Sequence, residues 1–198
     1  KEGSITGGGR LLENMMGLWI IQNCKRQWEA QEKLSWDDIV GMAKGAEEFG
    51  FMIDVNAHDF FDGEAMPGKI SGYCEKTGQG VPQTKGQIIR AVYESLAMSY
   101  REAFGVMEQV RGKRIEVLHI IGGGSKNRLL NQFTANAIGR PVVAGPAEAT
   151  AIGNLMVQVK ASGEVGSLGE MRQVIRDSFD VETFEPQDTE KWDEQYER

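Results

Sequence analysis

The sequence predicts an α/β fold that is rich in helix. Two stretches in the second half carry this prediction: residues 115–121 and 141–144 are short β-branched runs that end in glycine and precede helix-like segments. Short connections of this kind imply parallel strands joined by right-handed crossovers. The third observation is a long helix-like segment that follows Pro82 and keeps its apolar residues on one face to about Gly112.

The elements predicted for the first half are mostly helical. In order they are a glycine-rich loop or strand end (1–9), a helix (10–31), a second helix (35–49), a strand-and-loop stretch (51–63), a short helix (66–77) and the long helix. The first helix depends on apolar residues at broadly helical spacing. The second has a defined start, because Ser35 can act as an N-cap and two aspartates follow in the first turn.

The second half alternates strands and helices before an acidic tail. The predicted elements are a strand (115–121), a helix-like segment (125–138), a strand (141–144) and two helices (148–161 and 168–178). Residues 182–198 contain seven acidic and two basic side chains, and therefore carry −5 of the net charge of −7. We expect this tail to be a solvated helix that follows a domain covering 1–181.

The composition excludes several classes of protein. Of the 198 residues, 40% are hydrophobic and 26% are charged, which is typical of a soluble globular chain. No apolar run is long enough to span a membrane, and no signal peptide is visible. The negative net charge argues against binding nucleic acid or anionic lipid through bulk charge.

The cysteines indicate a reducing compartment, and the first residue indicates a longer protein. Cys24 and Cys74 lack a C-x-x-C partner and a ligand-spaced histidine, which favours reduced thiols in the cytoplasm over a disulfide or a zinc site. The sequence begins with lysine and not methionine, so we expect it to be a piece of a longer protein.

A triple glycine is the first candidate binding loop. Gly122, Gly123 and Gly124 follow the first predicted strand, where they allow a ligand to approach the backbone closely. Ser125 can cap the next helix, whose free N–H groups would attract a phosphate. The spacing matches neither a dinucleotide fingerprint nor a P-loop. A tight structural turn is the alternative.

A second candidate loop follows the second predicted strand at Gly145. The small residues after it, at positions 147, 149, 151 and 153, allow a helix to lie close to a sheet or to a flat ligand. Close helix–sheet packing is the plainer interpretation. Ligands of open α/β sheets collect at the carboxyl ends of the strands, so two glycine-rich loops at one edge favour a single site.

Polar residues in apolar surroundings form the third set of candidates. Asn14 and Gln22 lie in the predicted first helix, about 12 Å apart along its axis, and need hydrogen-bond partners or a ligand. Structural amides are the alternative. We expect His119 to be a hydrogen-bonded core residue, whereas His58 lies in an acidic loop without a second histidine to complete a metal site.

Taken together, several stretches resemble the later part of the rhamnulokinases. In chain order these are 10–22, 73–82, 90–97, 119–124, 131–132, 140–149 and 153–154. Each is weakly specific alone, but the combination covers nearly the whole chain apart from the acidic tail. Rhamnulokinases are FGGY sugar kinases, whose two domains have the actin-like, ribonuclease-H-like ATPase fold and close over ATP and a sugar. The resemblance makes 1–181 a partial C-terminal kinase domain without its first strands.

The resemblance also implies a reaction and a set of ligand contacts. The reaction would transfer the γ-phosphoryl group of Mg-ATP to the 1-hydroxyl of L-rhamnulose. The implied partners are the sugar, ATP and an N-terminal domain of the same protein, with no nucleic acid and no membrane. The matching positions imply a sugar contact at Asn14 and nucleotide contacts at Gln22, Gly122, Gly123, Gly124 and Gly145.

The sequence departs from the family in one respect that matters for catalysis. The family's catalytic base is an aspartate in a G-x-D-T-like segment that precedes an S-G-T-type strand. The only Asp-Thr pair here is Asp188–Thr189, which no glycine precedes, and Ser-Gly-Thr does not occur. We therefore expect no turnover by this chain alone, and metal ligands that lie mostly outside it. The missing strands also predict an unpaired sheet edge and, as a hypothesis, self-association through it.

Three alternatives remain open. Another FGGY kinase, for L-fuculose or a pentulose, would have a similar C-terminal part. A non-catalytic actin-like module could bind a nucleotide as a sensor, and a G-x-D-T segment upstream would separate that class from the kinases. A purely helical interaction protein is disfavoured by the two strand–turn–helix units.

Overall fold

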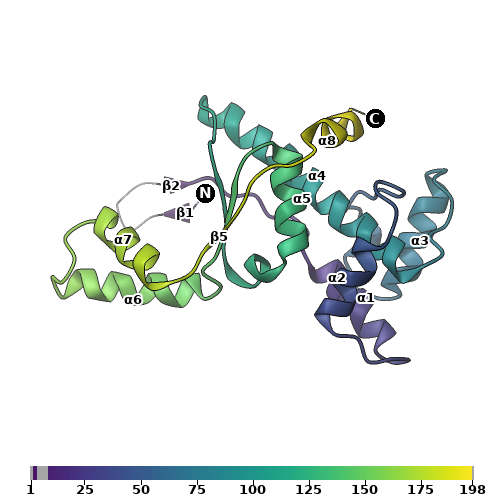
Figure 1. Cartoon of the computed structure of the whole chain (residues 1–198), viewed down its shortest axis with the longest axis horizontal. Helices are drawn as coiled ribbons and strands as arrows, with labels where there is room; N and C mark the ends of the chain where they lie inside the picture. Colours follow the sequence, from purple (N-terminus) through teal and green to yellow (C-terminus); the bar gives the residue numbers. More distant parts are fainter. Residues whose placement is uncertain (1, 4–8, 198) are drawn as a thin grey trace. The chain divides into compact units, whose positions relative to one another are not determined.

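The computed structural model describes residues 2–3 and 9–197 (Figure 1), and Lys1, residues 4–8 and Arg198 lie outside the described part. The chain divides into two compact units, Lys1–Ala103 and Phe104–Arg198. The first contains β1 (Glu2–Gly3), β2 (Gly9–Arg10), α1 (Trp19–Trp28), α2 (Trp36–Lys44), the 3₁₀ helix η1 (His58–Phe60), α3 (Met66–Lys76) and most of α4 (Lys85–Arg111). The second contains β3 (Leu118–Ile120), the 3₁₀ helix η2 (Gly122–Lys126), α5 (Arg128–Ile138), β4 (Val142–Ala144), α6 (Ala149–Ala161), α7 (Leu168–Ser178), β5 (Glu182–Phe184) and α8 (Thr189–Tyr196).

The long helix α4 organises the first unit. Residues 86 and 88–98 of α4 are buried, so this part of the helix has neighbours all round. At Gly86 the contact is with the end of α2, where a Cβ atom would lie 2.5 Å from the carbonyl oxygen of Met42. The missing side chain therefore allows α2 and α4 to approach closely.

A buried ion pair on α4 holds the loop that follows α2. The Nε of Arg90 donates to Oε1 of Glu94 at 2.7 Å, and its NH1 donates to the carbonyl oxygens of Ala43 and Ala46 at 3.3 and 3.2 Å. Oε2 of Glu94 accepts the N–H of Phe49 at 2.8 Å. Burial raises the pKa of Glu94 to about 7, although the hydrogen bond and the charge of Arg90 act in the opposite direction.

Most of the helices predicted for the first unit are confirmed, with some shifted ends. α4 and α3 lie where the apolar pattern predicts them. α2 ends at Lys44, five residues before the predicted end, and begins with a full capping box. In that box, Ser35 Oγ accepts the N–H of Asp38 at 3.1 Å and Asp38 Oδ2 accepts the N–H of Ser35 at 2.8 Å. Both cysteines are free, as predicted, and the structure also shows that they are buried.

Two predictions for the first unit are wrong. The first helix begins at Trp19 and not at residue 10, because Gly17 weakens a helix there and the N–H of Met16 donates to Asn56 Oδ1 at 3.2 Å. Residues 51–63 contain no strand, because side chains bind the backbone in place of a neighbouring strand. Gln79 Oε1 accepts the N–H of Met52 at 2.7 Å, and Ser95 Oγ accepts that of Ile53 at 2.9 Å.

The second unit is built on a three-stranded sheet with the order β3-β4-β5. β3 and β4 are parallel, as the two strand–turn–helix units predict, and β5 is antiparallel to β4. The hydrophobic cluster on the sheet contains Ala135 and Ile138 of α5 with Val142, Ala144 and Phe184 of the strands. Within the described residues β3 lies at an edge, and self-association through an unpaired edge stays a prediction.

Helices α6 and α7 pack on one another through a separate cluster of Ile152, Met156, Val165 and Met171. Both helices begin within one residue of their predicted starts. In the described part of the chain, no helix combines the length and the apolar character needed to cross a bilayer.

The acidic tail corrects the expectation of a solvated helix. Residues 182–184 form β5, which is hydrogen-bonded to β4, and only the following residues form a helix, α8. Trp192 of α8 is 4% exposed, and its ring centroid lies 5.4 Å from that of Phe133 on α5. The acidic segment therefore contains a strand of the sheet and a buried tryptophan, and it belongs to the same compact unit as the sheet.

Candidate functional site

The two glycine turns meet at the carboxyl ends of the parallel strands. The N–H of Gly122 donates to the carbonyl oxygen of Pro146 at 3.3 Å, and the N–H of Gly145 donates to that of Ile120 at 2.8 Å. These bonds continue the β3–β4 pairing beyond the ends of both strands. The prediction that the two loops share one edge of the sheet is confirmed, and this edge is the place where open α/β sheets bind ligands.

Each glycine in these turns has its own structural reason. Gly122 and Gly145 have φ angles of +76° and +112°, which side chains rarely adopt. Gly124 is in contact range of Ile120, since a Cβ atom would lie 3.7 Å from Cγ2 of that residue. A Cβ atom on Gly123 would meet nothing within 4 Å in the described part of the chain. Gly123 is exposed and borders open space.

Two asparagines hold the triple-glycine turn against α5. Oδ1 of Asn127 accepts the N–H of Leu130 at 3.0 Å and caps the helix. Nδ2 of Asn131, a residue that is 1% exposed, donates to the carbonyl oxygen of Ser125 at 2.9 Å. Ser125 is not the cap that the sequence predicts, because η2 extends to Lys126 and delays the start of the helix. Its hydroxyl donates to the carbonyl oxygen of Gly122 at 2.7 Å.

The roles of Asn127 and Asn131 were missed from the sequence. Asparagine is a preferred N-cap residue, so Asn127 itself was the signal for the later start of α5 that the choice of Ser125 passed over. Oδ1 of Asn131 is buried and has no partner in the described residues. The turn is thus attached to α5 by the side chain of Asn131 and to the loop after β4 by a backbone hydrogen bond from Gly122 to Pro146.

The second loop has a neighbour that the sequence did not indicate. A Cβ atom on Gly145 would lie 3.2 Å from the carbonyl oxygen of Asp180 and 3.6 Å from Cα of Val181. Two of the four small residues after this loop do not show the close packing on the sheet that the plainer interpretation predicts. Ala151 is exposed, and a Cβ atom on Gly153 would meet nothing within 4 Å among the described residues.

The other two predicted contacts lie in the first unit. Asn14 is exposed and lies in the segment before α1, and Gln22 is exposed on α1 itself. Their placement on a single helix is wrong, because α1 begins only at Trp19. The alternative of buried structural amides is wrong as well, since neither residue is buried. Their contacts with a ligand stay a prediction.

The two histidines lie in different surroundings in the described part of the chain. His119 is exposed on β3, so its prediction as a core residue is wrong, because β3 is an edge strand with little covering it. His58 borders an open pocket of about 710 Å³ between the η1 loop and α3. Within the described residues, no three His, Cys, Asp or Glu side chains are grouped as metal ligands.

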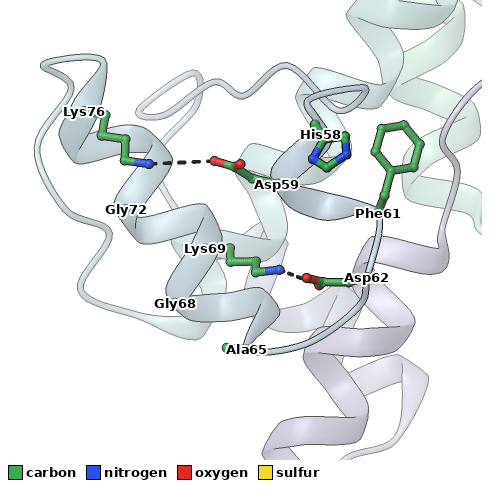
Figure 2. Close-up of a pocket in the computed structure, with 9 residues that line it drawn as sticks. All are labelled: His58, Asp59, Phe61, Asp62, Ala65, Gly68, Lys69, Gly72 and Lys76. Carbon is green, nitrogen blue, oxygen red and sulfur yellow. Dashed lines mark hydrogen bonds and ion pairs between the residues drawn. The ribbon is translucent and has the colours of Figure 1, made fainter.

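Ion pairs span the pocket beside His58 and leave it nearly neutral. Figure 2 shows Lys76 and Lys69 of α3 reaching toward Asp59 and Asp62. Lys76 Nζ lies 3.7 Å from Asp59 Oδ2, and Lys69 forms an ion pair with Asp62. None of the predicted site residues lines this pocket.

Sequence comparison relates the chain to sugar kinases. Residues 2–162 match the model described as the FGGY family of carbohydrate kinases, C-terminal domain. The chain is 44% identical over 196 residues to a rhamnulokinase of Bacteroides thetaiotaomicron, covering 99% of this chain and 40% of that protein. It is 41% identical over 182 residues to a rhamnulokinase of Bacillus subtilis, covering 92% and 37%. The chain therefore spans about 40% of the length of these curated relatives.

Solved structures show the same fold. A gluconate kinase from Lactobacillus acidophilus superposes with a TM-score of 0.63 at 14% identity, covering 92% of this chain and 36% of that one. A Plasmodium falciparum glycerol kinase with ADP superposes with a TM-score of 0.60 at 18% identity, covering 90% and 35%. The chain, which is rich in helix and has a small three-stranded sheet, accordingly has part of an actin-like ATPase fold. The chain belongs to the FGGY family of carbohydrate kinases and contains that family's C-terminal domain.

Proposed function

We propose that this chain is the nucleotide-binding part of a rhamnulokinase, which transfers the γ-phosphoryl group of ATP to the 1-hydroxyl of L-rhamnulose. Its family membership and its relatives named rhamnulokinase support the proposal. The observation that carries the nucleotide site is the meeting of two glycine turns at the carboxyl ends of β3 and β4, with open space at Gly123. Such a backbone cradle fits a flat, phosphate-bearing ligand.

The residues of the chain have different roles in this proposal. The backbone of Gly122, Gly123 and Gly124 lines the nucleotide pocket, and Gly145 shapes its second wall. Within the first unit, the resemblance to the family implies a nucleotide contact at Gln22 and a sugar contact at Asn14. ATP supplies the phosphoryl group, and the Mg²⁺ that accompanies it is held mostly by residues outside this chain. The contribution of this chain is binding and orientation, which account for much of catalysis in phosphoryl transfer.

A valine at position 123 tests the nucleotide site. We expect the chain to bind Mg-ADP saturably in a calorimetric titration, and Gly123→Val to weaken binding at least about tenfold, since the side chain fills the open space. Gly105→Val is the matched control, because its Cβ atom also meets nothing within 4 Å in the described residues but lies on α4. Equal affinities, or no binding by the folded chain, would contradict the site.

The chain by itself is expected to show no sugar phosphorylation. It has no G-x-D-T-like segment to supply the carboxylate that accepts the proton of the hydroxyl. The measurement is ADP release from Mg-ATP with L-rhamnulose in a coupled assay, with a complete rhamnulokinase relative as the positive control. Turnover near the usual range of enzymes, about 1 s⁻¹ or more, would show that the proposal misplaces the catalytic base.

A further inference from the structure

The segment from Asp180 to Glu197 crosses the second unit and lies beyond the residues that match the family model. The match to the family model stops at residue 162, whereas this segment contains β5 and α8. Figure 1 shows the chain returning from α7 through β5 to α8, which lies beside α5. We name Asp180–Glu197 the C-terminal strap.

The strap contacts the β4 side of the candidate site. Phe184, Thr183 and Glu182 pair with the three residues of β4, from Val142 to Ala144. The chain just before β5 lies against the glycine turn that follows β4, where a Cβ atom on Gly145 would lie 3.2 Å from the carbonyl oxygen of Asp180. One face of the second loop is therefore closed by the strap and not by a ligand.

The strap also binds α5 along most of its length. Arg128, the first residue of α5, forms an ion pair with Glu182, and its guanidinium lies 5.6 Å from the ring centroid of Phe184. Farther along α5, Phe133 packs on Trp192. The two contacts lie on different turns of the helix, so the strap constrains both its position and its direction.

Polar side chains of α5 complete the attachment. Nε2 of Gln132 donates to the carbonyl oxygen of Glu185 at 2.8 Å and to Oδ1 of Asn136 at 2.7 Å. The same oxygen of Asn136 accepts the N–H of Gln187 at 2.9 Å. The strap backbone thus accepts one hydrogen bond from Gln132 and donates one to Asn136, and these two side chains are themselves hydrogen-bonded to one another.

We propose that the C-terminal strap is a positioning device for the triple-glycine turn, acting through α5. Gln132 holds the strap, and its neighbour in sequence, Asn131, holds the carbonyl oxygen of Ser125 within the turn. Because both residues lie on one helical turn, a shift of α5 away from the strap moves the anchor of the glycine turn with it. The expected effect of the strap on nucleotide binding rests on the proposed function. Its expected effect on the triple-glycine turn does not.

Two variants of the intact chain test this device by hydrogen exchange. Gln132→Glu keeps the size of the side chain but removes the two donated hydrogen bonds, and Trp192→Ala removes the ring contact. We expect both to raise the exchange rate of the protected amides at Gly122, Asn127 and Leu130. For Gln132→Glu the increase should be about tenfold, the effect of losing one or two net hydrogen bonds. For Trp192→Ala it should be at least as large, because a buried ring is removed. Glu194→Gln, on the exposed side of α8, is the control and should leave these rates unchanged.

The amide of Gln187 reports on the strap itself and makes the experiment decisive. Faster exchange at Gln187 with unchanged rates at Gly122, Asn127 and Leu130 would overturn the proposal. Trp192→Phe, which keeps a ring beside Phe133, should restore slow exchange in the turn. If Trp192→Ala loses its secondary structure by circular dichroism, the result with Gln132→Glu decides the question.

Titration of the same proteins with Mg-ADP separates this proposal from the proposed function. If the wild-type chain binds Mg-ADP, Gln132→Glu should weaken that binding severalfold, even though position 132 lies outside the glycine turns. An unchanged affinity for Mg-ADP would overturn the link between the strap and the nucleotide. If the folded wild-type chain does not bind Mg-ADP, the nucleotide site fails, while faster exchange in the turn would still support the strap as its positioning device.

Discussion

Replacing Gly86 by valine is expected to lower the free energy of unfolding of the first unit by about 3 kcal/mol, the upper part of the usual range for overpacking. A Cβ atom at this position would lie 2.5 Å from the carbonyl oxygen of Met42 and 3.2 Å from its carbonyl carbon. Backbone atoms cannot turn aside as a flexible side chain can, so α2 and α4 must separate. Urea unfolding followed by tryptophan fluorescence measures the effect, since Trp19, Trp28 and Trp36 all lie in this unit.

Gly41→Val is the matched control for this experiment. Gly41 lies on α2 next to Met42, but it is exposed and its Cβ atom would meet nothing within 4 Å in the described residues. We expect little change in stability there, because valine has a better helix propensity than glycine and meets no obstacle. Equal midpoints for the Gly86 and Gly41 variants would show that the two helices are not in the close contact described.

Replacing Arg90 by methionine is expected to cost about 3–5 kcal/mol of unfolding free energy above pH 7, because it leaves a buried carboxylate without its partner. Glu94 is 0% exposed and accepts hydrogen bonds from Arg90 and from the N–H of Phe49. In the variant, only the hydrogen bond from Phe49 would remain of these two. The carbonyl oxygens of Ala43 and Ala46 would also lose the guanidinium. The measurement is again urea unfolding, at pH 5 and pH 8.

The pH dependence has a definite sign. The pKa of Glu94 is about 7 in the folded chain and near the ordinary 4.5 in the unfolded chain. The folded state therefore holds the proton more tightly, and this contribution to stability is complete below about pH 4.5 and is lost as the pH rises through about 7. Without Arg90 the pKa of Glu94 rises further, so the Arg90→Met variant should lose more stability at pH 8 than at pH 5.

The double variant Arg90→Met, Glu94→Gln is the control for that dependence. It has no charge at either position, so it should be more stable than Arg90→Met at pH 8 and should not lose stability through Glu94 between pH 5 and pH 8. Hydrogen bonding lowers the pKa of Asp38 and of Asp62, and these groups titrate below the window. The same loss at pH 5 and pH 8 in Arg90→Met would show that the carboxylate is not the cause.

Gly145 illustrates how the structure can explain a glycine that the sequence makes a candidate for a ligand contact. Its place after a strand made it a candidate for the nucleotide pocket, and the turn does lie beside the triple glycine. In the structure, its φ angle of +112° and the carbonyl oxygen of Asp180 already require a residue without a side chain. The glycine is thus explained by the backbone, and a ligand contact needs evidence of its own.

The sequence by itself determined the features that depend on neighbours in the chain. The apolar stripe of α4, the Ser35 cap of α2 and the two strand–turn–helix units all follow from short-range periodicity and turn chemistry. Parallel strands bring their carboxyl ends to one edge, so the meeting of the two glycine turns could be derived without coordinates. These patterns are local, and local physics was sufficient for them.

Only the tertiary structure decided what depends on residues far apart in the chain. Asn56 takes the N–H of Met16, so the first helix starts late, and a run of like charges conceals the strand β5 and the buried Trp192. Asn131, rather than Ser125, anchors the glycine turn to α5. The periodic spacing of apolar residues indicates which side chains are buried. It does not indicate which distant backbone group each polar side chain will bind.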